Sequence, residues 1–265
     1  MYFTVDGQEV YTATGAETHR PGKPFITFIH GAGCDHTEWV LFARFFSRNG
    51  FNVLSPDLPG HGKSTVAPLT SVEQLAQWVL ALLDAAKVGT TILVGHSLGS
   101  LIALETAAKN PQHISRLVML GTTVPMSVSD ALLNAARDRS QAAVDIVMQF
   151  GHAFSSQLGH NPVAGISAMN HRMRILERGL PTNLFEDLNA CHTYLGGLEA
   201  ARSLHMPVML LLGDQDRMTP PHSTQALIAA LKAPDVRMIP NCGHMLMSEQ
   251  PEAVHQALVA AAMGR

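Results

Sequence analysis

A serine between two glycines, where a predicted strand meets a predicted helix, is the feature that most constrains this chain. The motif is Gly95-His96-Ser97-Leu98-Gly99; an apolar run at 91–94 precedes it and a segment rich in Leu and Ala at 98–109 follows it. A turn this tight leaves no room for side chains two positions before and after the serine, which explains the glycines. The strained backbone would lift the Ser97 hydroxyl above the strand, at the positive end of the following helix. Such a turn presents a serine as a nucleophile, and an ordinary glycine-containing turn is the alternative.

Composition limits the classes of protein to which the chain can belong. Of its 265 residues 46% are hydrophobic and 15% are charged, with a formal net charge of -3. These values indicate a globular protein of one or two domains. No basic run indicates a nucleic-acid partner, and apolar runs such as 208–212 are too short to span a membrane. We therefore expect a small-molecule substrate, with no nucleic-acid or membrane partner, and leave the oligomeric state open.

The cysteines and the first residues of the chain indicate where in the cell the protein is found. Three widely separated cysteines, Cys34, Cys191 and Cys242, fit reduced thiols better than a disulfide framework. Residues 1–7 lack the basic and apolar regions of a signal peptide. Both observations predict a cytoplasmic protein.

Apolar runs that alternate with amphipathic segments predict an α/β fold. A hairpin is predicted around Asp6-Gly7. Further strands are predicted at 25–29, 51–55, 91–94, 117–120, 206–212 and 236–239. Helices are predicted at 39–48, 71–86, 98–109, 223–231 and 251–262. Thr70 and Glu73 have the spacing of a capping box for the second helix. This order predicts a mostly parallel central sheet with helices on both faces.

Residues 122–204 interrupt the alternation. They contain about four helical stretches and no clear strand pattern. We predict an all-helical cap at 122–204, inserted into a core formed by 1–121 and 205–265. Ligands of open α/β sheets bind at the carboxyl ends of the strands, which such a cap would cover. The alternative is a helical segment that only adds bulk.

Four motifs in order carry a resemblance to a known family. They are His30-Gly31-Ala32-Gly33, the D-x-x-G-x-G-x-S pattern at 57–64, the serine turn, and then Asp216 and His244 after two late strands. The chain resembles the α/β-hydrolase family, in the branch with a helical lid, over essentially its whole length. The order Ser, Asp, His is the one that this fold uses. The resemblance implies the α/β-hydrolase fold and acyl-transfer chemistry.

The resemblance also implies a catalytic triad. Ser97 would be the nucleophile, and His244 would be the base that takes its proton. The family pattern G-x-x-D-x-x-x-P at 213–220 selects Asp216 as the carboxylate that orients the histidine, with Asp214 as its rival.

Two backbone N–H groups are the candidates for an oxyanion hole. Leu98 follows the nucleophile directly, and Ala32 lies between two glycines after the strand at 25–29. An ordinary glycine turn is the alternative for Ala32. His30 and His96 flank these donors, and we expect them to brace the loops.

Serine at the turn excludes two branches of the family, because haloalkane dehalogenases and epoxide hydrolases carry Asp there. We predict a serine hydrolase that acts on a small carboxylic ester, lactone or thioester. A C–C bond hydrolase or a cofactor-free perhydrolase could use the same triad. A ligand receptor with weak turnover is the alternative from another class.

No cofactor or metal is expected, because the chain lacks H-E-x-x-H, C-x-x-C, G-x-G-x-x-G and Walker motifs. Several cap residues could form an apolar pocket or simply pack together: Met126, Met148, Phe150, Phe154, Met169 and Met173. Arg172 and Arg174 could hold a substrate carboxylate or be solvated. Cys191 is expected to pack in the core, with pocket lining as the alternative, and Cys34 is expected to play no part.

Overall fold

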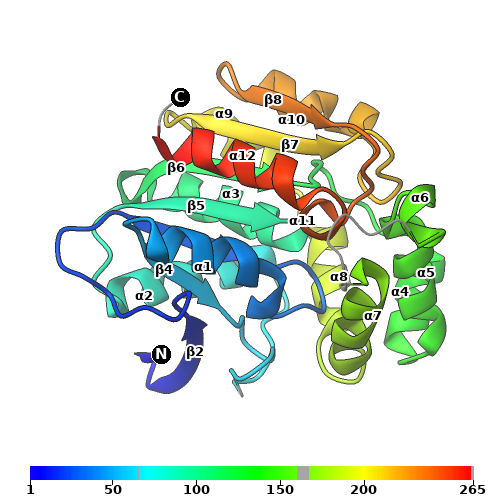
Figure 1. Cartoon of the computed structure of the whole chain (residues 1–265). Helices are drawn as coiled ribbons and strands as arrows, with labels where there is room; N and C mark the ends of the chain where they lie inside the picture. The colour runs from blue at the N-terminus through cyan, green and yellow to red at the C-terminus, as the bar shows by residue number, and fades with distance from the viewer. Residues whose placement is uncertain (65, 160–166, 264–265) are drawn as a thin grey trace.

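An eight-stranded sheet forms the centre of the computed structural model, which describes residues 1–64, 66–159 and 167–263 (Figure 1). The strand order is β1-β2-β4-β3-β5-β6-β7-β8. Strand β2 pairs antiparallel with β1 and β4, and the other pairings are parallel. The strands are β1 (Tyr2–Val5), β2 (Gln8–Ala13), β3 (Phe25–Ile29), β4 (Asn52–Pro56), β5 (Thr91–His96), β6 (Ile114–Leu120), β7 (Val208–Gly213) and β8 (Asp235–Ile239).

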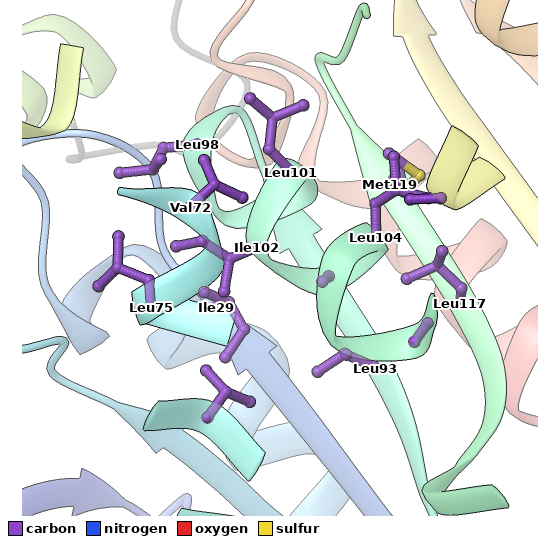
Figure 2. Packing of buried hydrophobic residues seen from close by; sticks show 14 of the residues in the cluster. Ile29, Val72, Leu75, Leu93, Leu98, Leu101, Ile102, Leu104, Leu117 and Met119 are labelled. Carbon is purple, nitrogen blue, oxygen red and sulfur yellow. The ribbon is translucent and has the colours of Figure 1, made fainter. Parts of the chain in front are cut away.

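Helices cover both faces of this sheet. The core helices are α1 (Val40–Arg48), α2 (Val72–Ala85), α3 (Leu98–Lys109), α10 (Gln225–Ala230), α11 (Leu246–Glu249) and α12 (Pro251–Met263). Residues of β6 alternate between the faces, so that Leu117 and Met119 pack with α2 and α3 while Val118 and Leu120 pack with α1 and α12. Figure 2 shows the first of these clusters, in which side chains of α3 lie over β5 and β6. The predicted fold class is confirmed.

Local sequence explains the ends of several elements. The hairpin turn between β1 and β2 has positive φ at both Asp6 and Gly7, as a two-residue hairpin turn requires. The predicted capping box of α2 is wrong by one residue. Ser71, not Thr70, caps the helix, because its extended backbone brings its hydroxyl to the amide N–H of Gln74 at 3.2 Å. Gln74 then accepts a bond from the Thr70 amide at 3.3 Å.

The insertion between β6 and β7 has six helices and no strand among its described residues, where the sequence suggested four helical stretches. They are α4 (Asp130–Arg137), α5 (Gln141–Gly151), α6 (Phe154–Gln157), α7 (Ala168–Gly179), α8 (Leu184–Thr193) and α9 (Gly197–Ser203). Helices α4, α5, α7 and α8 share an apolar cluster, called the cluster of the insertion below, which Met245 of the core joins. They lie beyond the carboxyl ends of the parallel strands (Figure 1).

Helix α9, unlike α4, α5, α7 and α8, contributes no residue to the apolar cluster of the insertion. It packs against α3 and α10, and its Ala200 and Ala201 belong to the main core cluster. The division of the chain at 122 and 204 remains a prediction, and this packing favours a cap that ends before α9.

Candidate active site

The serine turn joins β5 to α3. Ser97 has φ 52° and ψ -119°, a conformation that is strained for a residue with a side chain. A Cβ atom on Gly95 would lie 2.1 Å from the carbonyl oxygen of Gly99, and one on Gly99 would lie 2.3 Å from that of Ile29. Both glycines are therefore required by the close approach of backbones, and the serine stands at the first turn of α3.

His244 and Asp216 meet at the ends of β7 and β8. Asp216 Oδ2 lies 2.8 Å from His244 Nδ1, and both side chains are buried. Asp216 Oδ1 accepts the amides of Met218 and Thr219, each at 2.8 Å, and the Thr219 hydroxyl donates to Oδ2 at 2.7 Å. Burial alone would raise the pKa of Asp216, but His244 and these hydrogen bonds outweigh it and lower the pKa to about 2. The carboxylate is thus ionised at neutral pH, and its hydrogen bond with Nδ1 fixes the orientation of the His244 ring.

Asp214 has a different environment. Its side chain accepts the amide of Cys242 at 3.1 Å, which braces the loop after β8, and the residue is exposed. It is Asp216, and not Asp214, that the structure places beside His244.

A cavity of about 400 Å³ lies at the carboxyl ends of the strands, because Ser97 after β5 and Thr219 after β7 line it. Ser97, His244 and Ala32 all line it, and no hydrogen bond joins the Ser97 hydroxyl to His244 among the described residues. Hydrogen bonds between a nucleophile and its base often tighten only when substrate binds. The remaining wall comes from the segment that leads into α4, from α4, α5 and α8, and from the residues after Asp216: Met126, Ser127, Val128, Ser129, Ala131, Leu132, Ile146, Phe150, Leu188, Cys191, Arg217, Met218 and Thr219.

Only some of the predicted pocket residues lie in that wall. Met126 and Phe150 line the cavity, whereas Met148 is buried in the apolar cluster of the insertion and Phe154 is 69% exposed. Met169 and Met173 pack against the same cluster. Cys191 lines the cavity as well as packing in the core. Sequence reasoning missed Ile146, although its spacing of four from Phe150 on one helix was a usable signal.

The arginines of the cap are engaged in ion pairs. Buried Arg172 lies 2.5 Å from Glu38 and also donates to Cys34 Sγ. Exposed Arg174 pairs with Glu177 at 2.7 Å. Arg172 is therefore not solvated, and it lines a second cavity of about 30 Å³ that also touches Ser97 and His244. Burial raises the pKa of the Cys34 thiol well above its usual value, so this cysteine is an inert neighbour at neutral pH.

Arg217 was not singled out in the sequence. It is the one Arg, Lys, Asp or Glu among the described residues that line the larger cavity. Its guanidinium lies 5.0 Å from the centre of the Phe150 ring and donates to the carbonyl oxygen of Gln149. A cation thus stands at the rim of an otherwise neutral and mostly apolar cavity.

The 31–33 loop follows β3 and carries one of the predicted oxyanion donors. The Gly31 amide donates to Glu38 at 2.8 Å and the Gly33 amide donates to Asp187 at 2.7 Å. Ala32 lies between them on the cavity wall. Leu98 is the first residue of α3, so its amide has no acceptor within the helix.

The two flanking histidines make bracing contacts. His30 Nε2 accepts the amide of Leu58 at 3.1 Å and ties the 31–33 loop to the segment after β4. Burial lowers the pKa of His30, which keeps the ring neutral and able to accept. His96 lies between Glu38, 3.1 Å from Nδ1, and the carbonyl oxygen of His244, 2.9 Å from Nε2.

One group of residues has the composition of a metal site. Ligand atoms of Asp35, His36 and Asp57 lie within 4.8 Å of one another among the described residues. Asp57 already accepts the His36 amide at 2.7 Å and the Lys63 amide at 2.8 Å, and Asp35 accepts from Thr37. These bonds explain the cluster as a support of the 57–64 loop.

Comparisons with known proteins identify the family of the chain. The sequence profile of the "Alpha/beta hydrolase family" matches residues 28–257. This chain belongs to that family. The α/β hydrolase is 29% identical over 250 residues to a pimeloyl-[acyl-carrier protein] methyl ester esterase of Aromatoleum aromaticum, with 87% of this chain and 94% of that protein covered. It is 24% identical over 246 residues to an (E)-2-((N-methylformamido)methylene)succinate hydrolase of Acinetobacter baylyi, with 90% of each chain covered.

A solved structure supports the fold. The enol-lactonase from Burkholderia xenovorans superposes with a TM-score of 0.84 at 21% identity, and the match covers 99% of this hydrolase and all of that chain.

No helix among the described residues of the hydrolase is long and apolar enough to cross a membrane.

Proposed function

We propose that this α/β hydrolase cleaves a small carboxylic ester, lactone or thioester through an acyl-enzyme on Ser97. His244 acts as the general base and Asp216 orients it. The observation that carries the proposal is the bond of 2.8 Å between Asp216 and His244 Nδ1, on the wall of a cavity that Ser97 shares. An acceptor at Nδ1 leaves Nε2 of the neutral ring free to take a proton.

The reaction proceeds in two halves. Nε2 of His244 takes the Ser97 proton while Oγ attacks the acyl carbon, and the negative charge forms on the carbonyl oxygen. The amides of Ala32 and Leu98 donate to that oxygen. The bond to the leaving alcohol or thiol then breaks, and His244 returns the proton to it. Water repeats the sequence on the acyl-enzyme and releases the acid.

The relatives support an ester or lactone as the bond that is cleaved, because their names include a methyl ester esterase and an enol-lactonase. The mostly apolar cavity of about 400 Å³ fits a substrate of modest size. A C–C bond hydrolase remains the second candidate, because a 2-hydroxy-6-oxononadienedioate/2-hydroxy-6-oxononatrienedioate hydrolase is 22% identical over 255 residues. We also propose a cytoplasmic location, which the sparse cysteines favour.

A fluorophosphonate probe with a panel of substrates tests the proposal. We expect the probe to label Ser97 stoichiometrically, and Ser97→Ala to abolish both labelling and turnover of aliphatic esters, lactones and thioesters. Labelling elsewhere, or ester turnover that survives Ser97→Ala, contradicts it. Turnover restricted to vinylogous 1,5-diketones favours the C–C candidate, and stoichiometric ligand binding without turnover favours the receptor.

A further inference from the structure

The three amides of the 31–33 loop have unequal partners. The Gly31 amide donates to Glu38 Oε2 at 2.8 Å, and the Gly33 amide donates to Asp187 Oδ2 at 2.7 Å. Within the described part of the chain, the Ala32 amide between them has no hydrogen-bond partner. Ala32 lines the cavity of about 400 Å³ and the smaller one of about 30 Å³, and Ser97 lines each of them too. Two carboxylates thus occupy the flanking amides and leave the middle one for a ligand.

Each carboxylate is itself held in place. The side chains of Glu38 and Asp187 are 3% and 1% exposed. Glu38 Oε1 pairs with Arg172 at 2.5 Å and with His96 at 3.1 Å, and Asp187 Oδ2 pairs with His61 at 2.8 Å. Hydrogen bonds to ionised acceptors are about twice as strong as neutral ones, and burial removes the competition from water.

The pKa shifts agree with these pairs. Burial would raise the pKa of Glu38, but Arg172 and His96 outweigh it and hold that pKa well below its usual range. Burial would lower the pKa of His61, but the Asp187 carboxylate outweighs it and raises the pKa. Glu38 is therefore charged at neutral pH, and the Asp187–His61 pair favours the charged imidazole.

Helices α7 and α8 of the insertion also pack closely against the 31–33 loop. A Cβ atom on Gly33 would lie 2.9 Å from Leu184 of α8, and one on Gly179 of α7 would lie 2.7 Å from the Gly33 carbonyl oxygen. Asp187 comes from α8 and Arg172 comes from α7. The loop is thus held on one side by the core and on the other by the insertion.

We propose that Glu38 and Asp187 are positioning residues that clamp the 31–33 loop, so that the Ala32 amide points at the developing oxyanion. This inference rests on the proposed acyl-enzyme function. It makes oxyanion stabilisation depend on the docking of α7 and α8, because α8 supplies Asp187 and α7 supplies the cation beside Glu38. The insertion then contributes to the catalytic rate as well as to the shape of the cavity.

The test compares turnover with binding of a trifluoromethyl ketone, which adds to the serine as a tetrahedral oxyanion. We expect Glu38→Ala and Asp187→Ala each to lower kcat at least about tenfold with little change in KM, since loss of a whole oxyanion donor costs about 10²- to 10³-fold. The inhibition constant of the ketone should rise by the same factor as kcat/KM falls. Glu38→Gln and Asp187→Asn should lie between the Ala variants and the wild type.

Asp57→Ala is the matched control. Asp57 is also a buried carboxylate that accepts backbone amides, but its partners are His36 and Lys63 and not the 31–33 loop. We expect it to lower the melting temperature without the parallel change in kcat and ketone affinity. All variants are compared at a temperature at which circular dichroism shows them folded. The clamp is refuted if the Glu38 and Asp187 variants behave like Asp57→Ala.

Amide exchange on the wild-type protein tests the clamp without any substitution. With glycine and alanine labelled by ¹⁵N, the Gly31 and Gly33 amides should exchange slowly in the free enzyme while the Ala32 amide exchanges fast. The ketone adduct should protect Ala32 as well. Fast exchange at Gly31 or Gly33 in the free enzyme overturns the clamp. If the ketone does not attach to Ser97, the proposed function fails first, whereas attachment with unchanged kinetics in the variants refutes the clamp alone.

Discussion

At the scale of single residues, the choice between two nearby aspartates decides the register of the site. Asp216 contacts His244, whereas Asp214 contacts the Cys242 amide. We expect Asp216→Asn to lower kcat by about 10³- to 10⁴-fold, because the amide favours the wrong tautomer of the histidine. Asp214→Asn should cost less than about tenfold. Steady-state kinetics on variants shown to be folded by circular dichroism provide the check, and a larger loss for Asp214→Asn contradicts the register.

The same carboxylate links stability to pH. Because the pKa of Asp216 is lowered from 3.8 to about 2 in the folded state, its ionisation stabilises the fold above about pH 4, and this contribution is lost as pH falls toward 2. The full effect is worth about 2 kcal/mol. The free energy of unfolding of the wild type, measured with urea, should therefore fall more steeply below pH 4 than that of Asp216→Asn. Parallel curves for the two proteins would show that the pKa shift is absent.

The positive charge of Arg217 predicts that the enzyme prefers substrates that carry a carboxylate. Its guanidinium is the one fixed positive charge among the described residues that line the larger cavity. We expect Arg217→Gln to lower kcat/KM about three- to fivefold for the monomethyl ester of a dicarboxylic acid and to leave it nearly unchanged for the neutral methyl ester of the same length, as loss of one exposed charged contact implies. Arg174→Gln, which lies outside the cavity wall, is the control. Equal losses on both esters would exclude charge recognition.

At the scale of elements, α5 has some residues that line the cavity and others that pack inside the insertion. On α5, Ile146 and Phe150 line the larger cavity, whereas Met148 is buried in the cluster of the insertion. Substitutions at neighbouring positions of α5 should therefore affect either the substrate preference or the stability of the fold, and not both.

Two substitutions on α5 test this division. We expect Ile146→Trp to shift the preference toward shorter acyl chains with a small change in melting temperature. Met148→Trp should lower stability by about 1 to 3 kcal/mol through overpacking and leave the acyl preference as it is. Activity on esters of increasing acyl length and thermal unfolding are the two measurements. Reversed effects would mean that the cavity does not bind the acyl chain.

At the scale of the whole molecule, buried polar contacts join the insertion to the core. Arg172 of α7 pairs with Glu38, Asp187 of α8 accepts the Gly33 amide, and Glu249 of α11 accepts the Ala153 amide at 2.8 Å. Since each contact crosses between the two parts, we expect them to unfold together in a single calorimetric transition.

Removal of one such contact tests their contribution. Arg172→Met leaves Glu38 buried with one partner fewer and should lower the free energy of unfolding by about 3 kcal/mol, the usual loss for a broken buried pair. Arg174→Met breaks an exposed pair on the same helix and should change it by less than about 0.5 kcal/mol. Urea unfolding provides both numbers, and equal effects would rule out a buried ion pair.

Sequence patterns among near neighbours in the chain were enough to predict the fold class and the serine turn. Strand β3 and helix α3 have the predicted bounds, because a continuous apolar run and a glycine-flanked turn depend on neighbours in the chain. The cap of α2 was misplaced by one residue, because Ser71 and Thr70 offer the same hydroxyl and only the backbone angles choose between them.

What the tertiary structure alone decided are the contacts between distant segments. The Gly33–Asp187 bond spans 154 positions and the His244–Asp216 bond spans 28. Arg172 had the same two open interpretations as Arg174 in the sequence, yet one is buried against Glu38 and the other is exposed. Periodicity reports which side of an element is apolar, but it carries no information about which element packs there. The sequence by itself therefore determined the sheet, the serine turn and the candidate amide donors, while the docking of the helical insertion decided most of the cavity wall and the bond of Asp187 to the Gly33 amide.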